Sequence, residues 1–541
     1  MTTIDHRPDA VTSAIADVAD DAGRALTGVV GWVTTADHKR VGRAFIVSSL
    51  MMGIAALVVG VLLGVERIDA NNTVLRADSI DQLFSLHRVG VSFLVVLPLL
   101  LGLSLAVAPL QVGSRSATFP RAAALGFWAW LSGSVMVVVA YVGNGGPGGG
   151  DAKMVDLFLM GLAMALIGVL ATAGSLVVTV LTSRAPGMRL DRTPMVAWSA
   201  LVGGVALVLT LPVLVGDLIL LSVDHHYARV AFGGNKDILT WMGWALGTPA
   251  TLVLVIPALG MVADILITAS GRRHPMRGGL LFGIGVAATA ALGAVMQKPN
   301  LLPWSGSSGS DRIKNLLPYA FFNLLPILGV VVTIGLGVLA LKAGKPRFSA
   351  ALVFGLLGGL SILAGVLASA LTPILDLQLV GTTYEEGVFV MIAYGAVLAG
   401  LGGVAHWGPK LWGRKIADKQ LAPLALLGAL GVDLAAIPLM VAGFQGQPAM
   451  AAGGYDYKLS PQLLNVLGAI GEAAVLATVL FFGLLALRSF TKGEAAGDDP
   501  WDGQTLEWAT SSPPPADNFA DLAMVSSATP LLDLKPARSG A

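Results

Sequence analysis

Twelve long apolar segments constrain this chain more than any other feature of its sequence. A segment of about 20 apolar residues is long enough to cross the hydrocarbon core of a bilayer as a helix. Only 12% of the residues are charged, about half the share usual in soluble proteins. We therefore predict an all-α, polytopic membrane protein whose first partner is the lipid bilayer. The twelve predicted transmembrane helices begin near Ala44, His87, Ala123, Val155, Met195, Leu239, Gly278, Leu316, Ala350, Gly387, Leu421 and Leu463.

The loops between these segments indicate how the chain is oriented. Loops on the N-terminal side hold fifteen Lys and Arg residues and those on the opposite side hold nine, which places both termini in the cytoplasm. We predict a cytoplasmic N-terminal segment (1–41), a twelve-helix domain (42–488) and an extended cytoplasmic tail (489–541) that lies at the surface. The tail is rich in Pro, Asp, Ser and Gly.

Charge and cysteine content exclude several classes of function. The formal net charge is +1, so there is no electrostatic case for a nucleic-acid partner. The chain has no cysteine, which excludes disulfides, cysteine-held iron–sulfur clusters and thiolate-bound metals.

His87 is the histidine best placed inside an apolar segment, "FSLHRVGVSFLVVLPLLLGL". An ionisable residue in a membrane span is costly, so it indicates a functional site with a partner. The sequence alone does not name that partner.

Several motifs resemble, in order, those of subunit I of the haem-copper oxidases, the cytochrome c and quinol oxidase family. They include "ADHKRVGRAF", the His87 segment, "GPKLWGR" and "DPWDGQTLEWATSSPPPADNF". The resemblance implies the twelve-helix bundle of that family. It also implies oxygen reduction coupled to proton pumping, with a bis-histidine haem and a centre made of a second haem and copper.

The ligand positions implied by the resemblance carry other residues. In the tenth span, "VGTTYEEGVFVMIA" places Val388 and Val390 where the family has two haem-binding histidines. In the sixth span, "GTPATL" places Thr248, Ala250 and Leu252 at the positions of a copper histidine, a glutamate and a tyrosine.

The family's proton-entry aspartate is replaced as well, by Ser116. Valine has no lone pair to offer to iron, and no histidine lies between His274 and His406 to replace the copper ligands. We therefore predict no copper site and no catalytic residues.

By the resemblance, His87 matches one axial ligand of the low-spin haem, and Val390 stands opposite it. We expect at most one haem, bound through His87 alone or with Met391 as a second ligand. The alternative is that His87 forms a hydrogen bond to a carbonyl or hydroxyl group inside the bundle.

Carboxylates are the other polar residues of the spans. Asp264 is expected to be structural, and Glu385 and Glu386 are expected to be solvated at the outer end of the tenth span. Asp433 and Glu472 lie near mid-span, where a charge is expensive. They indicate a proton or cation path, contact with a partner subunit, or a protonated carboxyl group bonded to a neighbouring helix.

These observations lead to three hypotheses. The first is a degenerate subunit I homologue, a non-catalytic component or partner of an aerobic respiratory complex that binds other subunits of it. The second is a functional cytochrome c oxidase subunit I. The third is a transporter built on the emptied scaffold, with Asp433 and Glu472 as its polar path.

Overall fold

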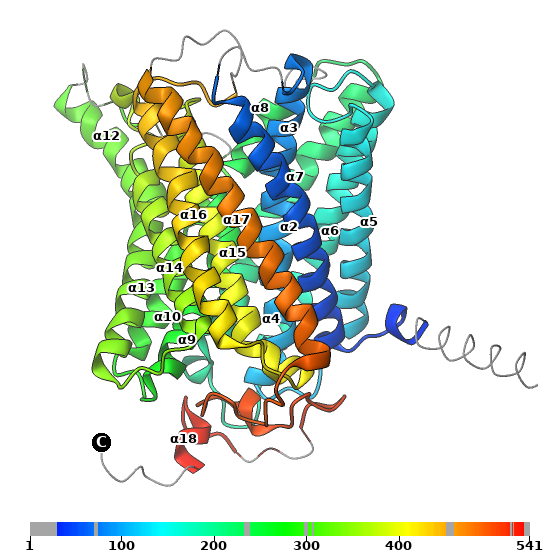
Figure 1. Ribbon diagram of the computed structural model, residues 1–541, viewed down its shortest axis with the longest axis vertical. Helices are drawn as coiled ribbons and strands as arrows, with labels where there is room; N and C mark the ends of the chain where they lie inside the picture. The colour runs from blue at the N-terminus through cyan, green and yellow to red at the C-terminus, as the bar shows by residue number, and fades with distance from the viewer. Residues whose placement is uncertain are drawn as a thin grey trace, which may run out of the picture.

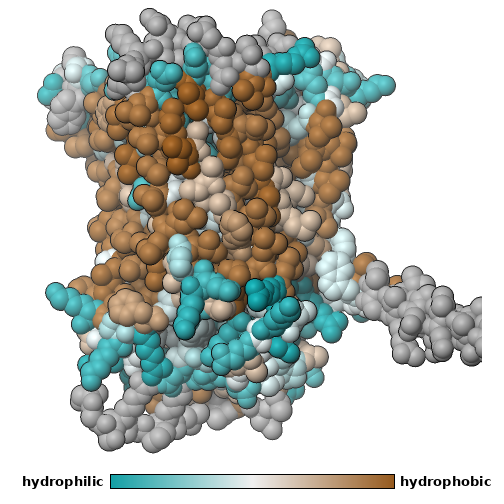
Figure 2. Space-filling view, viewed as in Figure 1, coloured by the Kyte–Doolittle hydropathy of each residue, from teal (hydrophilic) through white to brown (hydrophobic). Residues whose placement is uncertain are grey.

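The chain is an all-α bundle in the computed structural model, which describes residues 30–69, 74–231, 238–296, 301–303, 305, 308–450, 459–519, 522 and 524–534. Twelve helical segments in these ranges are long and apolar enough to cross a membrane, as predicted. Figure 1 shows them side by side and nearly parallel, and Figure 2 shows a broad hydrophobic belt across the face in view. The segments are α2 (His38–Glu66), Ser79–Gln111, α5 (Pro120–Val142), α6 (Ala152–Thr182), α7 (Met195–His226), Ile238–Ser270, Arg277–Ala294, Gly309–Ala343, α14 (Ala350–Ser369), α15 (Thr383–Trp412), α16 (Asp418–Phe444) and α17 (Leu459–Lys492).

Four of these spans are built from more than one helical element. Their parts are α3 (Ala77–Val89), π-helix η1 (Gly90–Val96) and α4 (Leu97–Gln111); α8 (Ile238–Gly243), η3 (Trp244–Leu246) and α9 (Ala250–Ser270); α10 (Arg277–Ala287) and α11 (Ala290–Ala294); and α12 (Gly309–Tyr319), π-helix η4 (Ala320–Leu324) and α13 (Leu325–Ala343). Both π-helical turns end two residues before a proline, Pro98 or Pro326. Proline has no N–H to donate, so the regular helical ladder is interrupted there.

Three spans form the centre of the bundle. The most apolar windows of Ser79–Gln111, Ile238–Ser270 and Thr383–Trp412 are completely buried, whereas the other nine are partly exposed. Small residues allow the close packing around α15. A Cβ on Gly358 of α14 would lie 2.6 Å from the Gly395 carbonyl oxygen of α15, so the two helices approach through facing glycines.

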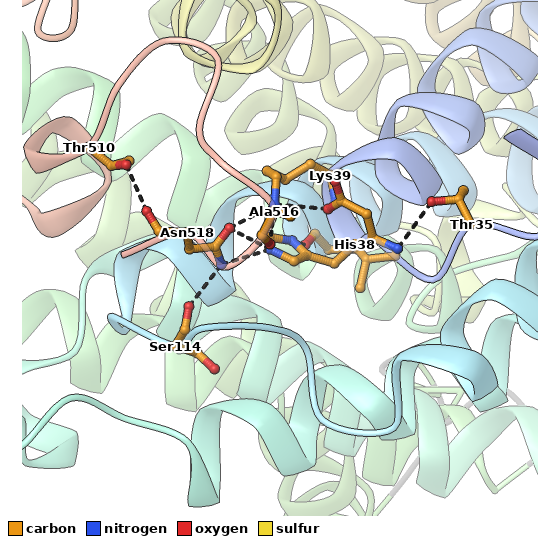
Figure 3. Close-up of polar contacts among 9 residues, drawn as sticks. Thr35, His38, Lys39, Ser114, Thr510, Ala516 and Asn518 are labelled. Atoms are coloured by element: carbon orange, nitrogen blue, oxygen red, sulfur yellow. Dashed lines mark hydrogen bonds and ion pairs between the residues drawn. The ribbon is translucent and has the colours of Figure 1, made fainter. Parts of the chain in front are cut away.

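Residues near the two ends of the chain meet at one end of the bundle, which we call the tail side (Figure 1). At the start of α2, His38 Nδ1 donates to the Leu105 carbonyl oxygen, and its Nε2 accepts from Asn518 Nδ2 at 2.9 Å. Lys39 Nζ donates to Asn518 Oδ1 at 2.8 Å and to the Ala516 carbonyl oxygen (Figure 3). Asn518 thus joins the first span to the C-terminal tail.

The prediction of a surface tail is wrong for part of the segment 489–541. Its described residues hold the end of α17 and the short helices η6 (Leu506–Ala509) and α18 (Pro530–Leu534), and Glu507, Trp508 and Asn518 are buried against the tail side of the bundle. The extended segment packs there because its backbone carbonyl groups find a donor on the bundle. Lys410 Nζ of α15 donates to the carbonyl oxygens of Asp498 and Thr510.

Candidate functional site around His87

His87 lies on α3, three residues before the start of the π-helical turn at Gly90, and its side chain is 1% exposed. Its Nε2 is 2.8 Å from the hydroxyl oxygen of Tyr394 on α15. The Tyr394 hydroxyl donates in turn to Glu472 Oε2 on α17, at 2.7 Å. Since that hydroxyl has a single proton, the Nε2–H of His87 donates to it. The partner of His87 is therefore a tyrosine–glutamate pair contributed by two other helices.

The other ring nitrogen of His87 faces Glu386. Its Nδ1 is 3.6 Å from Glu386 Oε1 and has no hydrogen bond. Glu386 is 2% exposed, and its Oε2 accepts from Arg88 Nε at 2.8 Å. The expectation that Glu386 is solvated is wrong. Glu386 is buried, and Arg88 takes the place of water in compensating the negative charge of its carboxylate.

The polar residues of α15 that face His87 share a helix face with Val390, and the ring of the neighbouring Phe389 lies edge-on to the imidazole. Glu386, Val390 and Tyr394 are four residues apart, so they lie on the same helix face. Val390 is fully buried between the two polar residues. The structure therefore brings Val390 to the face that meets His87, as the resemblance implied, and fills the turns on either side with groups that face the imidazole.

The positions compared with haem and copper ligands offer no nitrogen or sulfur. Val388 and Val390 are buried, as are Ala250, the first residue of α9, and Leu252. A group of three or more His, Cys, Asp or Glu residues placed to hold a metal does not occur among the described residues. The residues present therefore do not fit the family's two-haem and copper set.

Thr248 and Ser116, the remaining two positions, are more accessible than these. Thr248 lines a cavity of about 90 Å³ with Arg88, Pro249, Val388 and Phe389. This volume is well below the roughly 300 Å³ at which pockets for drug-sized ligands begin. Thr248 also lines a second, more open cavity of about 540 Å³ with Trp241, Trp244 and Glu385. Ser116 is exposed in the loop before α5, and its carbonyl oxygen accepts from the Ser114 hydroxyl.

The side chain of Met391 starts toward α14, whereas His87 lies on α3. A Cβ on Gly365 of α14 would be 3.0 Å from the Met391 Cβ, so the Met391 side chain starts on the α14 side of α15. One helical residue is a turn of about 100°, which separates Met391 from the helix face of Val390. Met391 as a haem ligand opposite His87 stays a prediction with no contact to support it.

The two mid-span carboxylates lie in different environments. Glu472 is 6% exposed and belongs to the His87 cluster. Asp433 is exposed on the outside of α16. A single polar path through both residues is not formed by the described part of the chain.

A second buried polar cluster lies at the tail side. Asp264 of α9 accepts from the backbone N–H groups of Met195 and Val196, and so caps α7, as a structural residue would. Gln111 Nε2 donates to Asp264 Oδ2 and to Glu507 Oε1, both at 3.0 Å. Burial raises the pKa of the Glu507 carboxyl to about 7, against the opposing effect of the Gln111 hydrogen bond.

Tyr394 is the member of the site that sequence reasoning missed. Tyrosine is an aromatic residue that often packs in apolar cores, and Tyr394 lies within the apolar segment "VFVMIAYGAVLAG". Nothing in that segment distinguishes it from a core residue. The available signal was its spacing, one turn beyond Val390 and two turns beyond Glu386 on the same face.

Comparisons with known proteins agree with this architecture. Residues 40–474 match the family model described as cytochrome C and quinol oxidase polypeptide I. The chain is 26% identical to cytochrome c oxidase subunit 1 of Bacillus subtilis, over 92% of this chain and 82% of the relative. It is 30% identical to a putative cytochrome c oxidase subunit 1-beta of Streptomyces coelicolor, over 95% of this chain and 91% of the relative.

A solved structure of a heme-copper terminal oxidase dimer shares the fold. Its TM-score is 0.66 at 14% sequence identity, over 85% of this chain and 84% of the matched chain.

Proposed function

Because the chain belongs to the cytochrome c and quinol oxidase polypeptide I family, we propose that it keeps the family's membrane scaffold without the oxygen-reducing centre. On this proposal it is a non-catalytic component or partner of an aerobic respiratory complex and binds other subunits of that complex. It holds no copper and at most one haem, through His87.

One observation carries the proposal. Val390 takes the position opposite His87, and the residues one turn on either side of it, Glu386 and Tyr394, both face the imidazole. The carboxylate of Glu386 is paired as well, because its Oε2 accepts from Arg88 Nε at 2.8 Å.

The same network explains how a bundle can keep polar groups where its relatives would keep a cofactor. Buried polar groups are tolerated when each finds a partner. Here Arg88 pairs with Glu386, and Tyr394 links His87 to Glu472. We propose that this cluster has a packing role in place of a redox role.

The orientation follows from the loop charges. We propose that the tail side is cytoplasmic, with both termini there, because the loops on that side carry the excess of Lys and Arg.

The two competing hypotheses lack support from the site. A working oxidase needs imidazole ligands at positions where this chain has valine and threonine. A transporter needs a polar path through the bundle, but Asp433 is exposed on the outside of α16 whereas Glu472 is buried beside Tyr394.

Affinity purification of the full chain from its native membranes tests the proposal. We expect recovery of other respiratory-complex subunits in fixed stoichiometry. We also expect that the chain expressed alone consumes no oxygen when reduced cytochrome c or a quinol is supplied as the electron donor. Purification without any such subunit contradicts the partner role, and oxygen consumption by the isolated chain contradicts the non-catalytic role.

A further inference from the structure

Asp433 is a charged residue on the lipid-facing side of a helix, near its middle. It is exposed, and no hydrogen bond or ion pair to it occurs among the described residues. It is fifteen residues from Asp418 at one end of α16 and eleven from Phe444 at the other, so it lies about 23 Å and about 17 Å from the helix ends. An aspartate side chain is too short to reach either interface from there.

The face around Asp433 is otherwise apolar and continuous. Residues at spacings of three and four along α16 are all exposed and point to the same side: Leu426, Leu430, Ile437, Val441 and Phe444. Figure 2 shows the hydrophobic belt on this side of the molecule. Asp433 therefore lies at the centre of a surface that contacts hydrocarbon in the isolated chain.

Small residues of α17 lie level with Asp433. A Cβ on Gly431 would contact Ala474 and Val475, and a Cβ on Gly471 would contact the Ala435 backbone. The antiparallel pairing that these contacts define sets Ala473 opposite Asp433, and Ala473 is exposed. A small residue at this level lets another helix approach closely.

From these placements we propose that the Asp433 face of α16, with the neighbouring edge of α17, binds a transmembrane helix of a partner protein that carries a Lys or Arg at mid-span. An unpaired carboxylate at the bilayer centre is costly, and so is a basic residue there. Pairing the two charges offsets part of the cost of each.

Other occupants fit this face less well. A second copy of the chain, docked through the same face, would bring two Asp433 carboxylates together, because a two-fold interface is self-complementary. Lipid headgroups lie at the interfaces, too far away to reach Asp433. The proposal does not depend on whether the chain binds a haem.

Photo-crosslinking in native membranes tests this interface. A photoreactive residue replaces Ile437, one turn from Asp433, in the full chain, and the same residue at Val208, exposed on α7, serves as a control site. We expect the position 437 probe, and not the position 208 probe, to yield an adduct whose peptide lies in a transmembrane segment of another protein, with a Lys or Arg within about one turn. Asp433→Leu should lower the adduct yield about tenfold, while a thermal midpoint at or above that of the parent shows that the variant folds.

A charge swap completes the test. Asp433→Lys should abolish the adduct, and replacing the identified basic residue of the partner by Asp should restore it. Adducts with lipid alone, with a second copy of this chain, or with a segment that lacks a basic residue would overturn the proposal. So would an adduct yield that does not change in Asp433→Leu and Asp433→Asn.

Discussion

The hydroxyl of Tyr394 is the connecting group of the His87 cluster, so we expect Tyr394→Phe to be unusually destabilising. The substitution keeps the ring and removes hydrogen bonds of 2.8 Å to His87 and 2.7 Å to Glu472. It leaves two buried polar groups without their partner, and each such loss costs about 1–3 kcal/mol. We predict that the free energy of unfolding falls by about 3 kcal/mol.

Tyr384→Phe is the matched control on the same helix. The Tyr384 hydroxyl makes one hydrogen bond, to the Ala368 carbonyl oxygen at 2.8 Å, so its removal should cost about 1 kcal/mol. Reversible unfolding of both variants and the parent in mixed detergent micelles measures the difference. A haem bound to His87 Nε2 would exclude Tyr394 from that nitrogen. Equal losses in the two variants would therefore refute the network described here.

Three further predictions concern other parts of the fold. Because burial raises the pKa of Glu507 in the folded state to about 7 from its ordinary value of 4.5, the protonated form is favoured by folding. The free energy of unfolding should thus decline by about 3 kcal/mol as pH rises from about 4.5 to about 7, and Glu507→Gln should flatten that decline; an unchanged profile contradicts the assignment. Gly60→Val should lower the thermal midpoint, because a Cβ at Gly60 would lie 2.7 Å from Glu472 Oε2 and 3.1 Å from His87 Nε2, whereas Gly216→Ala, in open space on α7, should not. Asn518→Ala removes the contacts to His38, Lys39 and the Ser114 carbonyl oxygen, so limited proteolysis should cut the tail faster than in the parent or in the exposed control Ser116→Ala; equal rates would show that Asn518 does not hold the tail.

Hydropathy predicted the spans well, because backbone hydrogen bonding in lipid leaves a helix as the one way for such segments to cross. The local composition of the tail was less informative. Pro, Gly and Asp are typical of solvated segments, yet Trp508 and Asn518 are buried. Trp508 packs against the His406 ring and the Lys410 ammonium group at the end of α15, and Asn518 donates to the Ser114 carbonyl oxygen. Those partners come from distant parts of the chain.

The candidate site was predictable in its positions and not in its contacts. The resemblance to the family predicted that His87 and Val390 lie opposite each other, because it implies the helix arrangement of that family. The environment of Glu386 depends on Arg88, and the bond from Tyr394 to Glu472 joins α15 to α17. Pairings between helices far apart in the sequence follow from packing, which a linear pattern does not encode.

The cofactor content of the purified full chain tests the central claim most directly. An optical spectrum of the reduced and oxidised protein, with iron and copper quantified per chain, distinguishes the alternatives. The account predicts no copper, no high-spin haem and at most one haem per chain, with any such haem lost in His87→Ala. Stoichiometric copper together with two haems per chain would contradict it.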